Sequence, residues 1–375
     1  MQLRGCGTAL VTPFRQDGSI DEAALRNLVA WQIESGIDFL VPCGTTGETP
    51  TLTHDEWLQV IDITAEVAAG RVPIVAGATS NSTHDAVQKA KEAAARPGVD
   101  AILTASPYYN KPTQEGQYRH FRAIAEAAEK PIILYNVPGR TGVNLEPATV
   151  ARLLEVANII GIKEASGNIA QIAEICGLAP ERFAVLSGDD AFTLPLIALG
   201  GVGLISVASN EIPHEMTEMV RAALNNDWTT ARSLYHKFLP LMQANFIETS
   251  PTPVKAVMAM MGKIEEVYRL PLLSMRRDNR SKIQKIATEA GLITKSVAPA
   301  AEAVDFYLYE NWLAGPHKVV LHRSSCGQCN RGKGRPAGHD ANHARWVGPY
   351  TTLAEAREAS HNLAGVLIRS ECKCI

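Results

Sequence analysis

The sequence lacks the features that mark several large classes of protein. It contains no run of about 18 apolar residues, so we expect no membrane-spanning helix. No charged and then apolar leader stands at its start, so we expect a cytoplasmic protein whose thiols stay reduced. The formal net charge is only −3 over 375 residues, and 46% of the residues are hydrophobic. This composition is typical of an ordinary globular enzyme.

Motifs for nucleotides and catalytic metals are missing from residues 1–293. The first apolar run is followed by Thr12-Pro13-Phe14 and not by the glycine-rich turn G-x-G-x-x-G of dinucleotide-binding proteins. Neither H-E-x-x-H, nor a G-K-[ST] loop, nor an acidic cluster with metal-ligand spacing occurs in this part of the chain. The sequence therefore favours a reaction that needs no cofactor.

Short apolar runs alternate with longer amphipathic stretches over more than half of the chain. The eight runs are residues 7–11, 39–41, 73–77, 101–104, 131–135, 159–162, 183–186 and 202–207. Helix start signals lie between them, among them Asp21, Ser82 and a capping box at residues 53–56. Eight strand–helix units of this length predict an α/β fold, a (β/α)8 TIM barrel over residues 1–226, rather than an open doubly wound sheet.

The chain changes character after the barrel. Helical patterns at 228–248, 252–262 and 274–291 have no strands between them, so residues 227–293 predict a C-terminal helical appendage. The Ala- and Pro-rich residues 294–305 are typical of a linker. Residues 306–375 predict a small α+β, Cys-rich module, with a strand and turn at 345–350, a helix at 353–363 and a last strand at 366–368.

Lys163 is the most informative residue of the barrel. It follows the β-branched run 159–162, which predicts a strand buried on both faces. Burial disfavours an ammonium ion and lowers its pKa, which makes the amine a nucleophile able to form a Schiff base with a carbonyl compound. The alternative is a lysine that extends out of the strand end and pairs with a surface carboxylate.

Other polar groups stand at the ends of neighbouring strands, where TIM barrels carry their active sites. The second run is followed by Gly44-Thr45-Thr46-Gly47-Glu48, whose hydroxyls and amides can hold a carboxylate, although a plain turn with a Thr cap explains it equally. Later runs are followed by Tyr108-Tyr109 and by Tyr135 to Arg140. Schiff-base chemistry needs a neutral amine, a proton relay and an anchor for the substrate carboxylate. Tyr135, Tyr109 and Thr45 supply hydroxyls for the relay, and the Arg140 guanidinium can hold a carboxylate as a fork.

With these motifs, residues 1–293 resemble the dihydrodipicolinate synthase branch of the pyruvate-dependent class I aldolases. The resemblance rests on six segments, namely residues 44–48, 107–112, 135–141, 161–164, 187–190 and 203–207. It implies a lyase of the diaminopimelate and lysine pathway that condenses pyruvate with L-aspartate-4-semialdehyde. It also implies a homo-oligomer, a dimer or a tetramer, and no cofactor for catalysis.

The resemblance assigns a role to each of these residues. It implies that Lys163 forms the imine with pyruvate and that Tyr135 donates and accepts the protons. Thr45 would link Tyr135 to Tyr109, and Tyr109 would reach into the site of a neighbouring subunit. By the same comparison Thr46 holds the pyruvate carboxylate, Gly188 and the backbone of Ile205 border the pyruvate, and Arg140 receives the carboxylate of the semialdehyde.

Two other functions are compatible with the barrel. The first alternative is another pyruvate-dependent aldolase, an N-acetylneuraminate lyase or a 2-keto-3-deoxy sugar-acid aldolase. N-acetylneuraminate lyases resemble the pattern up to the Thr pair and the lysine, but usually lack an arginine at the position of Arg140. Gly139-Arg140-Thr141 and Tyr108-Tyr109 therefore favour the lysine-pathway synthase. A regulatory protein that uses the barrel only as a scaffold is the second alternative. The complete set of strand-end groups argues against it.

The resemblance also points to an effector site for lysine at the dimer interface. The matching positions are Pro50, His54, Asn81, Asp85 and Tyr108. Asp85 stands where a glutamate is usual, and Trp57 replaces a histidine that occurs in sensitive enzymes. The sequence therefore leaves inhibition by lysine open.

The cysteines of the last segment have the spacing of a metal site. Cys326 and Cys329 form a C-x-x-C pair, Cys372 and Cys374 a C-x-C pair, and His322 can replace one of them. Four thiolates can hold a structural zinc ion, which would stabilise a module of this size. Disulfides or unconnected thiols are the alternatives. The basic loop 331–335 has no aromatic residue among its cations, so we expect no nucleic-acid partner.

Overall fold

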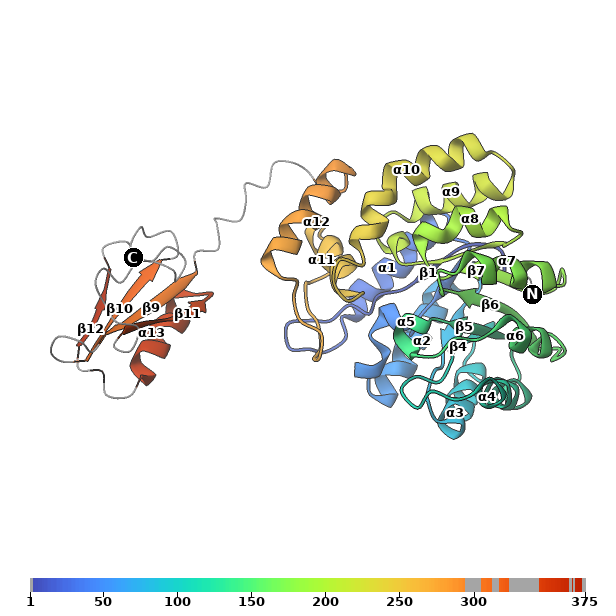
Figure 1. Cartoon of the computed structure of the whole chain (residues 1–375), viewed down its shortest axis with the longest axis horizontal. Coiled ribbons are helices and arrows are strands. Elements are labelled where there is room, and N and C mark those ends of the chain that lie inside the picture. Colours follow the sequence, from blue (N-terminus) through green and yellow to red (C-terminus); the bar gives the residue numbers. More distant parts are fainter. Residues whose placement is uncertain are drawn as a thin grey trace. The chain divides into compact units, whose positions relative to one another are not determined.

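The computed structural model describes residues 3–293, 305–311, 317–323, 344–363, 366 and 368–372. The chain divides into two compact units, Met1–Ile293 and Thr294–Ile375 (Figure 1). The first unit carries the barrel, and the second carries a separate sheet.

The barrel is built from eight parallel strands. In chain order they are β1 (Gly5–Ala9), β2 (Phe39–Val41), β3 (Val75–Gly77), β4 (Ala101–Ala105), β5 (Ile132–Asn136), β6 (Ile159–Glu164), β7 (Ala184–Ser187) and β8 (Gly203–Ser206). They pair in the order β2-β1-β8-β7-β6-β5-β4-β3. A parallel bridge between Leu40 and Ile74 joins the two remaining edges. The predicted (β/α)8 barrel is confirmed, and each strand lies on one of the eight apolar runs.

Helices follow the strands and surround them. They are α1 (Glu22–Glu34), α2 (His54–Ala68), α3 (Thr83–Ala94), α4 (Gln114–Ala127), α6 (Pro147–Leu153), α7 (Ile169–Leu178), α8 (Thr193–Ala198) and α9 (Pro213–Leu224). Their starts follow the sequence signals: Asp21 accepts a hydrogen bond from the Ala24 amide, and Ser82 accepts one from the Asp85 amide. Thr53 and Glu56 form the expected reciprocal capping box.

The strands are mostly apolar because they separate two packed layers. One layer lies between strands and helices, and the other fills the inside of the barrel. The inner layer includes Phe39, Leu103, Ile133, Tyr135, Leu186 and Ile205. Tyr135 and Ile205 therefore already lie inside the barrel, close to the ends of their strands.

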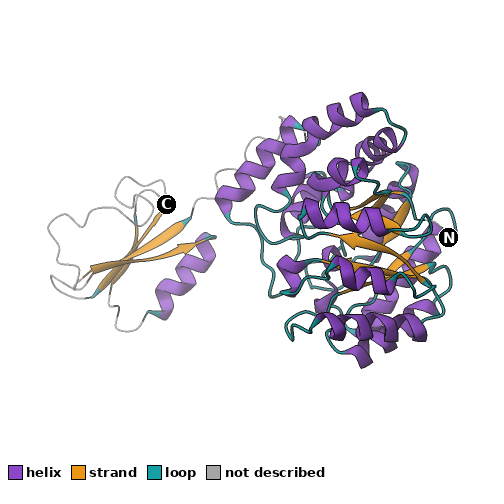
Figure 2. Cartoon of the chain, turned by 45° about the vertical axis from the view of Figure 1, so that its right-hand side comes forward, coloured by secondary structure: helices purple, strands orange, loops and turns teal. Residues whose placement is uncertain are grey.

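Three further helices complete the first unit. They are α10 (Trp228–Ala244), α11 (Thr252–Met260) and α12 (Arg277–Glu289). Figure 2 shows helices, in purple, packed around the orange strands of this unit. A small core of Ala256, Val257, Ile283 and Ala287 holds α11 against α12. These helices lie where the sequence predicts them, and each ends a few residues earlier than expected.

Within its described residues, the second unit is a four-stranded sheet with one helix packed on it. Its elements are β9 (Phe306–Asn311), β10 (Lys318–Arg323), β11 (Ala344–Tyr350), α13 (Leu353–Asn362) and β12 (Ile368–Glu371), and the sheet order is β11-β9-β10-β12. Leu308, Val319, Leu321 and Ala356 form its core. The predicted helix is present. The predicted last strand is present but displaced along the chain: β12 spans Ile368–Glu371 and pairs with β10, whereas Val366 packs into the core.

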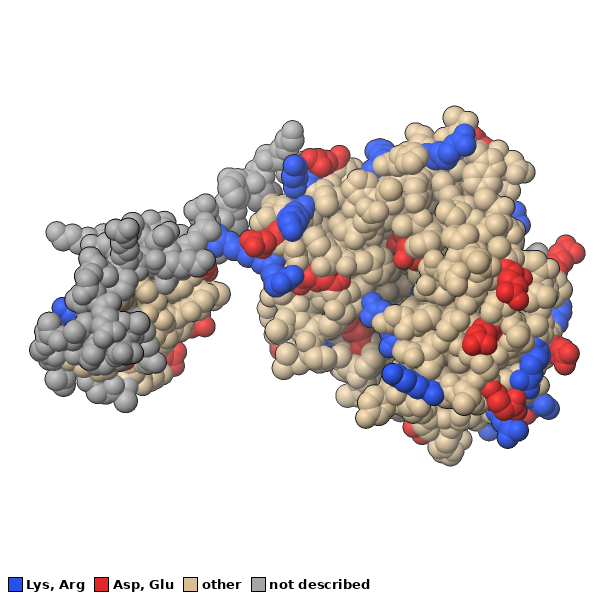
Figure 3. Space-filling model, viewed as in Figure 1, with Lys and Arg blue, Asp and Glu red and all other residues tan. Residues whose placement is uncertain are grey.

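Within the described residues, none of the helices is both long and apolar enough to cross a membrane. On the face of the barrel unit seen in Figure 3, basic and acidic side chains are intermixed.

Candidate active site

Lys163 and Tyr135 lie side by side at the carboxyl ends of two neighbouring strands. Strands β5 and β6 pair with Tyr135 opposite Lys163. Both residues are buried: Tyr135 has 6% of its surface exposed, and Lys163 has 5%. The Lys163 Nζ lies 4.5 Å from the centroid of the Tyr135 ring. The structure therefore brings the amine and the phenol together, as the strand-end argument predicts.

Burial changes the acidity of both groups. It lowers the pKa of Lys163 to about 8, and the charge of Arg140 acts in the same direction, while Asp190 and Asp189 oppose it. Burial also raises the pKa of Tyr135, against the charge of Arg140 and a hydrogen bond with the Thr45 side chain. At neutral pH the phenol is therefore protonated, and a useful fraction of Lys163 is a neutral amine.

The two threonines stand on a short turn after β2. Residues Thr45–Gly47 form a 3-10 turn, and its backbone closes with the Gly47 amide donating to the Gly44 carbonyl at 3.1 Å. Thr46 is buried, whereas Thr45 is half-buried beside Tyr135. The turn thus places one hydroxyl against the phenol and the other inside the protein.

A pocket of about 280 Å³ opens above Tyr135. Its lining includes Thr45, Tyr108, Tyr135, Arg140 and Thr141, together with Cys43, Gly44, Thr49, Pro50, Gly77, Thr79, Lys89, Leu103, Ala105 and Val137. Arg140 lies on the short helix α5 (Pro138–Thr141), and its Nη2 donates to the Ser250 carbonyl at 3.2 Å. Lys163 is not among the lining residues, but its amine lies beside Tyr135, which is one of them. An exposed guanidinium and a buried nucleophile on either side of Tyr135 suit a substrate that carries a carboxylate at one end and a carbonyl at the other.

Gly188 lets the end of β7 approach Lys163. A Cβ on this glycine would lie 2.7 Å from the Ala165 Cβ and 3.1 Å from the Lys163 Cγ. Its amide donates to the Glu164 carbonyl at 2.8 Å. Any side chain at this position would push against the stem of Lys163, so the glycine fixes where the amine lies.

Two buried carboxylates near Lys163 were not assigned from the sequence. Asp190 accepts hydrogen bonds from the Ser206 hydroxyl and the Val207 and Ala208 amides, and burial raises its pKa to about 6. Glu164 accepts from the Asn136 side chain at 3.0 Å. Glu164 is the last residue of β6, and Asp190 lies three residues after the end of β7. Both stand inside motifs that the sequence already singled out, and this position is the signal that could have identified them.

Tyr109 does not join this cluster within one chain. Its side chain is 87% exposed, and its backbone adopts φ 72°, a conformation that a bulky residue seldom takes. The adjacent Tyr108 lines the pocket instead. The phenol of Tyr109 therefore projects away from its own barrel.

The five positions expected for an effector are only partly gathered. Pro50 and Tyr108 line the pocket, and the Asn81 carbonyl accepts from Asn110 at 2.8 Å. His54 pairs with Glu92 at 3.3 Å, and Asp85 is exposed in the first turn of α3. Trp57 is buried, and its indole donates to the Gly77 carbonyl at 3.0 Å, so this side chain is committed to the core.

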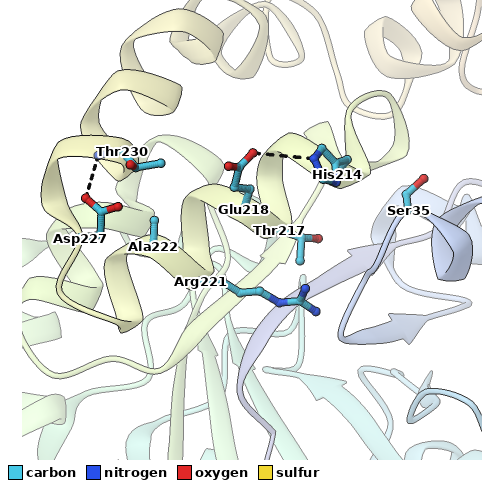
Figure 4. A pocket seen from close by; sticks show the side chains of 8 residues that line it. All are labelled: Ser35, His214, Thr217, Glu218, Arg221, Ala222, Asp227 and Thr230. Atoms are coloured by element: carbon cyan, nitrogen blue, oxygen red, sulfur yellow. Dashed lines mark hydrogen bonds and ion pairs between the residues drawn. The ribbon is translucent and has the colours of Figure 1, made fainter.

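A second depression lies on α9 and the start of α10 (Figure 4). Its polar groups pair mainly with each other. His214 pairs with Glu218 at 3.8 Å, and Asp227 accepts from the Thr230 amide at 3.1 Å. Arg221 donates to Asp38, which itself accepts from the Cys6 amide near the start of β1. This is the amino end of the strands, where polar groups of TIM barrels serve stability rather than catalysis.

The predicted zinc ligands fall mostly outside the described residues. Cys326, Cys329 and Cys374 lie there, while Cys372 directly follows β12, and its amide donates to the Leu321 carbonyl at 2.8 Å. His322 is buried in β10, with its ring 5.3 Å from that of Trp346. No group of three or more metal-ligating side chains occurs within the described parts of the chain.

Comparison with known proteins gives a consistent result for the first unit. The sequence profile of the dihydrodipicolinate synthetase family matches residues 2–290. A 4-hydroxy-tetrahydrodipicolinate synthase of Koribacter versatilis is 71% identical over 293 residues, which make up 78% of this chain and 98% of that protein. The protein of the same name from Acidobacterium capsulatum is 63% identical over 300 residues, covering 80% and 99%. The crystal structure of dihydrodipicolinate synthase from Aquifex aeolicus superposes with a TM-score of 0.76 at 43% identity, covering 78% of this chain and all of that one.

Proposed function

The chain belongs to the dihydrodipicolinate synthetase family, and we propose that its barrel condenses pyruvate with L-aspartate-4-semialdehyde through an imine on Lys163. This is the activity of a 4-hydroxy-tetrahydrodipicolinate synthase, a lyase of the class I aldolase type. The observation that carries the mechanism is the buried amine of Lys163 beside the buried phenol of Tyr135.

The first step is attack of the neutral Lys163 amine on the ketone carbon of pyruvate. A C–N bond forms, the oxygen takes up a proton, and water leaves from the carbinolamine to give the imine. Tyr135 is the group placed to deliver and recover that proton, because its phenol is protonated and lies beside the amine. The Thr45 side chain lies beside Tyr135 and lowers its pKa, and it extends the relay toward the mouth.

The protonated imine then withdraws electrons from the former pyruvate methyl group. Loss of a proton there gives an enamine, whose carbon attacks the aldehyde carbon of the second substrate. Thr46 and the strand ends bearing Gly188 and Ile205 border the pyruvate in this proposal. No step needs a metal or an organic cofactor.

We propose that Arg140 holds the carboxylate of the semialdehyde. Arg140→Ala is expected to lower kcat/KM for the semialdehyde by about 10- to 100-fold, because a charge-assisted fork to a carboxylate is lost. Trapping of the pyruvate imine by borohydride is expected to continue. Steady-state kinetics with each substrate varied in turn make the measurement.

Arg140→Lys is the matched control, because it keeps the charge near Lys163 and removes only the fork. It is expected to lose affinity for the semialdehyde with little change in imine formation. A semialdehyde KM that stays at the wild-type value in both variants would contradict this role and reopen the sugar-acid aldolase alternative.

The rate of imine formation is expected to rise with pH. The pKa of Lys163 is about 8, and only the neutral amine attacks the ketone. The rate at fixed pyruvate should therefore increase roughly fivefold between about pH 7 and pH 8 and level off above about pH 9. Rapid mixing with pyruvate followed by borohydride quenching gives this rate directly.

Asp190→Asn supplies the internal check on that profile. The negative charge of Asp190 raises the pKa of Lys163. Removal of this charge should therefore shift the midpoint of the curve of imine-formation rate against pH to lower pH. A profile that is flat from about pH 6.5 to 9.5 would show that deprotonation of Lys163 does not limit imine formation.

We further propose that the active unit is an oligomer in the cytoplasm. The exposed phenol of Tyr109, held by an unusual backbone conformation, has no role within its own barrel and suits the site of a neighbouring subunit. The size of the full-length protein by light scattering, and its change in Tyr109→Ala, check the assembly. Sensitivity to lysine stays a prediction that a rate measurement with millimolar lysine decides.

Zinc in the second unit also stays a prediction. Its support is the spacing of the cysteines, and nothing within the described residues adds to it. The metal content of the full chain, compared with that of a chain ending at Ile293, tests it. Equal zinc in both would remove the proposal.

A further inference from the structure

A fully buried ion pair joins the threonine turn to the helical appendage. Glu48 directly follows the turn Thr45–Gly47, and Lys255 lies in α11, 207 residues further along the chain. The Lys255 Nζ lies 2.5 Å from the Glu48 Oε1, and both side chains have 0% of their surface exposed. Neither group touches the pocket, and the reaction described above uses neither of them.

Backbone and aromatic groups surround the Lys255–Glu48 pair. The Lys255 ammonium also donates to the Thr12 carbonyl at 3.1 Å and lies 4.4 Å from the centroid of the Phe14 ring. The Arg269 guanidinium lies 4.3 Å from the centroid of the same ring. The backbone amide of Arg269 donates to the Glu48 Oε2 at 3.4 Å. Glu48 is thus held by a side chain and by a backbone amide from two segments of the appendage.

The same contacts determine where the turn ends. The Glu48 amide donates to the Thr45 carbonyl at 3.2 Å, and the Thr12 hydroxyl donates to the Gly47 carbonyl at 2.7 Å. Glu48 itself adopts φ 53°, which is unfavourable for a residue with a side chain and needs support from its surroundings. A Cβ on Gly47 would lie 3.2 Å from the Leu10 carbonyl, so the turn also packs closely on the end of β1.

Stability alone does not account for such a pair. Well-packed apolar side chains in place of a buried ion pair often leave a protein equally stable or more so. What an ion pair adds is a fixed distance and direction between two segments. Here those segments are the turn that carries Thr45 and Thr46 and a helix outside the barrel.

We propose that Lys255 and Glu48 are positioning residues through which α11 holds the threonine turn in contact with Tyr135. The pair fixes the end of the turn, and the turn fixes the Thr45 hydroxyl against the phenol. The helical appendage thereby contributes to catalysis without reaching the substrate. This inference rests on the proposed function, because the contact matters only if Tyr135 and Thr45 transfer protons.

The test is a double variant, Glu48→Gln with Lys255→Met, which removes both charges and leaves no unpaired ion. We expect a melting temperature close to that of the wild type and a fall in kcat of about tenfold or more, set by loss of one positioned proton-transfer contact. Borohydride trapping of pyruvate on Lys163 should remain complete, because the amine itself is untouched. Asp62→Asn with Arg96→Met is the matched control, since that pair joins α2 to the second residue after the end of α3 and contacts neither the turn nor α11.

A purely structural pair is distinguished by combining each background with Thr45→Val. If the pair acts through Thr45, Thr45→Val lowers kcat much less in the double variant than in the wild type. In the Asp62→Asn, Arg96→Met control, it lowers kcat as much as it does in the wild type. An equal fall in kcat on Thr45→Val in all three backgrounds would overturn the proposal. So would a wild-type kcat in the double variant. If the double variant does not fold, Glu48→Asp keeps both charges, and its shorter reach is expected to lower kcat in the same way. A wild-type kcat in Glu48→Asp would then overturn it.

Failure of this inference is separable from failure of the proposed function. A wild-type protein that forms no pyruvate adduct refutes the imine mechanism, and the positioning role falls with it. A wild-type protein that forms the adduct, beside a double variant with unchanged kcat, refutes only the positioning role.

Discussion

Lys163→Ala is expected to abolish the condensation, with a fall in kcat on the order of 10⁴-fold or more. Without the amine no imine forms, and the pyruvate methyl group then has no electron sink to make its protons acidic. Substrate binding should persist in part, because Arg140 and the threonine turn are unchanged. Coupled assays of product formation at saturating pyruvate and semialdehyde make the measurement.

Lys163→Arg separates loss of the nucleophile from loss of a buried cation. The guanidinium keeps the charge and stays protonated at every accessible pH, so it cannot attack a ketone. We expect this variant to be as inactive as Lys163→Ala. Circular dichroism and thermal melting confirm that both variants fold. Activity within tenfold of the wild type in either one would show that the amine of Lys163 does not carry the reaction.

Tyr135→Phe is expected to lower kcat by about 10²- to 10⁴-fold, the usual range for loss of a positioned acid–base group. The ring, its burial and its packing against Lys163 are retained, so only the hydroxyl is removed. Imine formation should still reach completion but more slowly, because water must replace the phenol in moving the protons. Single-turnover trapping with borohydride resolves this step from the later ones.

Tyr118→Phe is the control for that substitution. Tyr118 lies on α4, and the Cζ of Arg152 lies 3.9 Å from the centroid of the Tyr118 ring. Tyr118 lines no part of the pocket. Its loss should leave kcat within about twofold of the wild type, as for most surface substitutions. If Tyr135→Phe is equally mild, the proton donor is a different group.

The barrel and the neighbourhood of Lys163 could be predicted because both follow from local patterns. Parallel strands buried on both faces give continuous apolar runs, and those runs lie at the observed strands. Parallel strands also end at the same edge, so the polar residues at the ends of β5 and β6 come together there. The register that places Tyr135 opposite Lys163 follows from this geometry.

The remaining features depend on contacts that no local pattern marks. Lys255 sits in a helical pattern as any solvated lysine would, and its partner Glu48 is 207 residues away in the sequence. The roles of Asp190 and Glu164 appear only when the strand ends are packed against each other. The exposed position of Tyr109 goes with a left-handed backbone conformation that the sequence does not mark.

In the second unit the local patterns were less informative. The helix at Leu353–Asn362 begins at a Thr352 cap and was predictable from its amphipathic pattern. Strands β9 and β10, by contrast, precede the cysteine-rich segment and pair with each other through contacts that the cysteine spacing does not reveal. The last strand is displaced from its predicted position for the same reason, since its start is set by pairing with β10.

The most direct test of the imine mechanism is to trap the intermediate. The full-length protein is incubated with pyruvate and borohydride, digested, and analysed by peptide mass spectrometry. We predict one reduced pyruvate adduct per chain, on Lys163, and no adduct in Lys163→Ala. An adduct on another lysine, or none on the wild-type protein, would contradict the account.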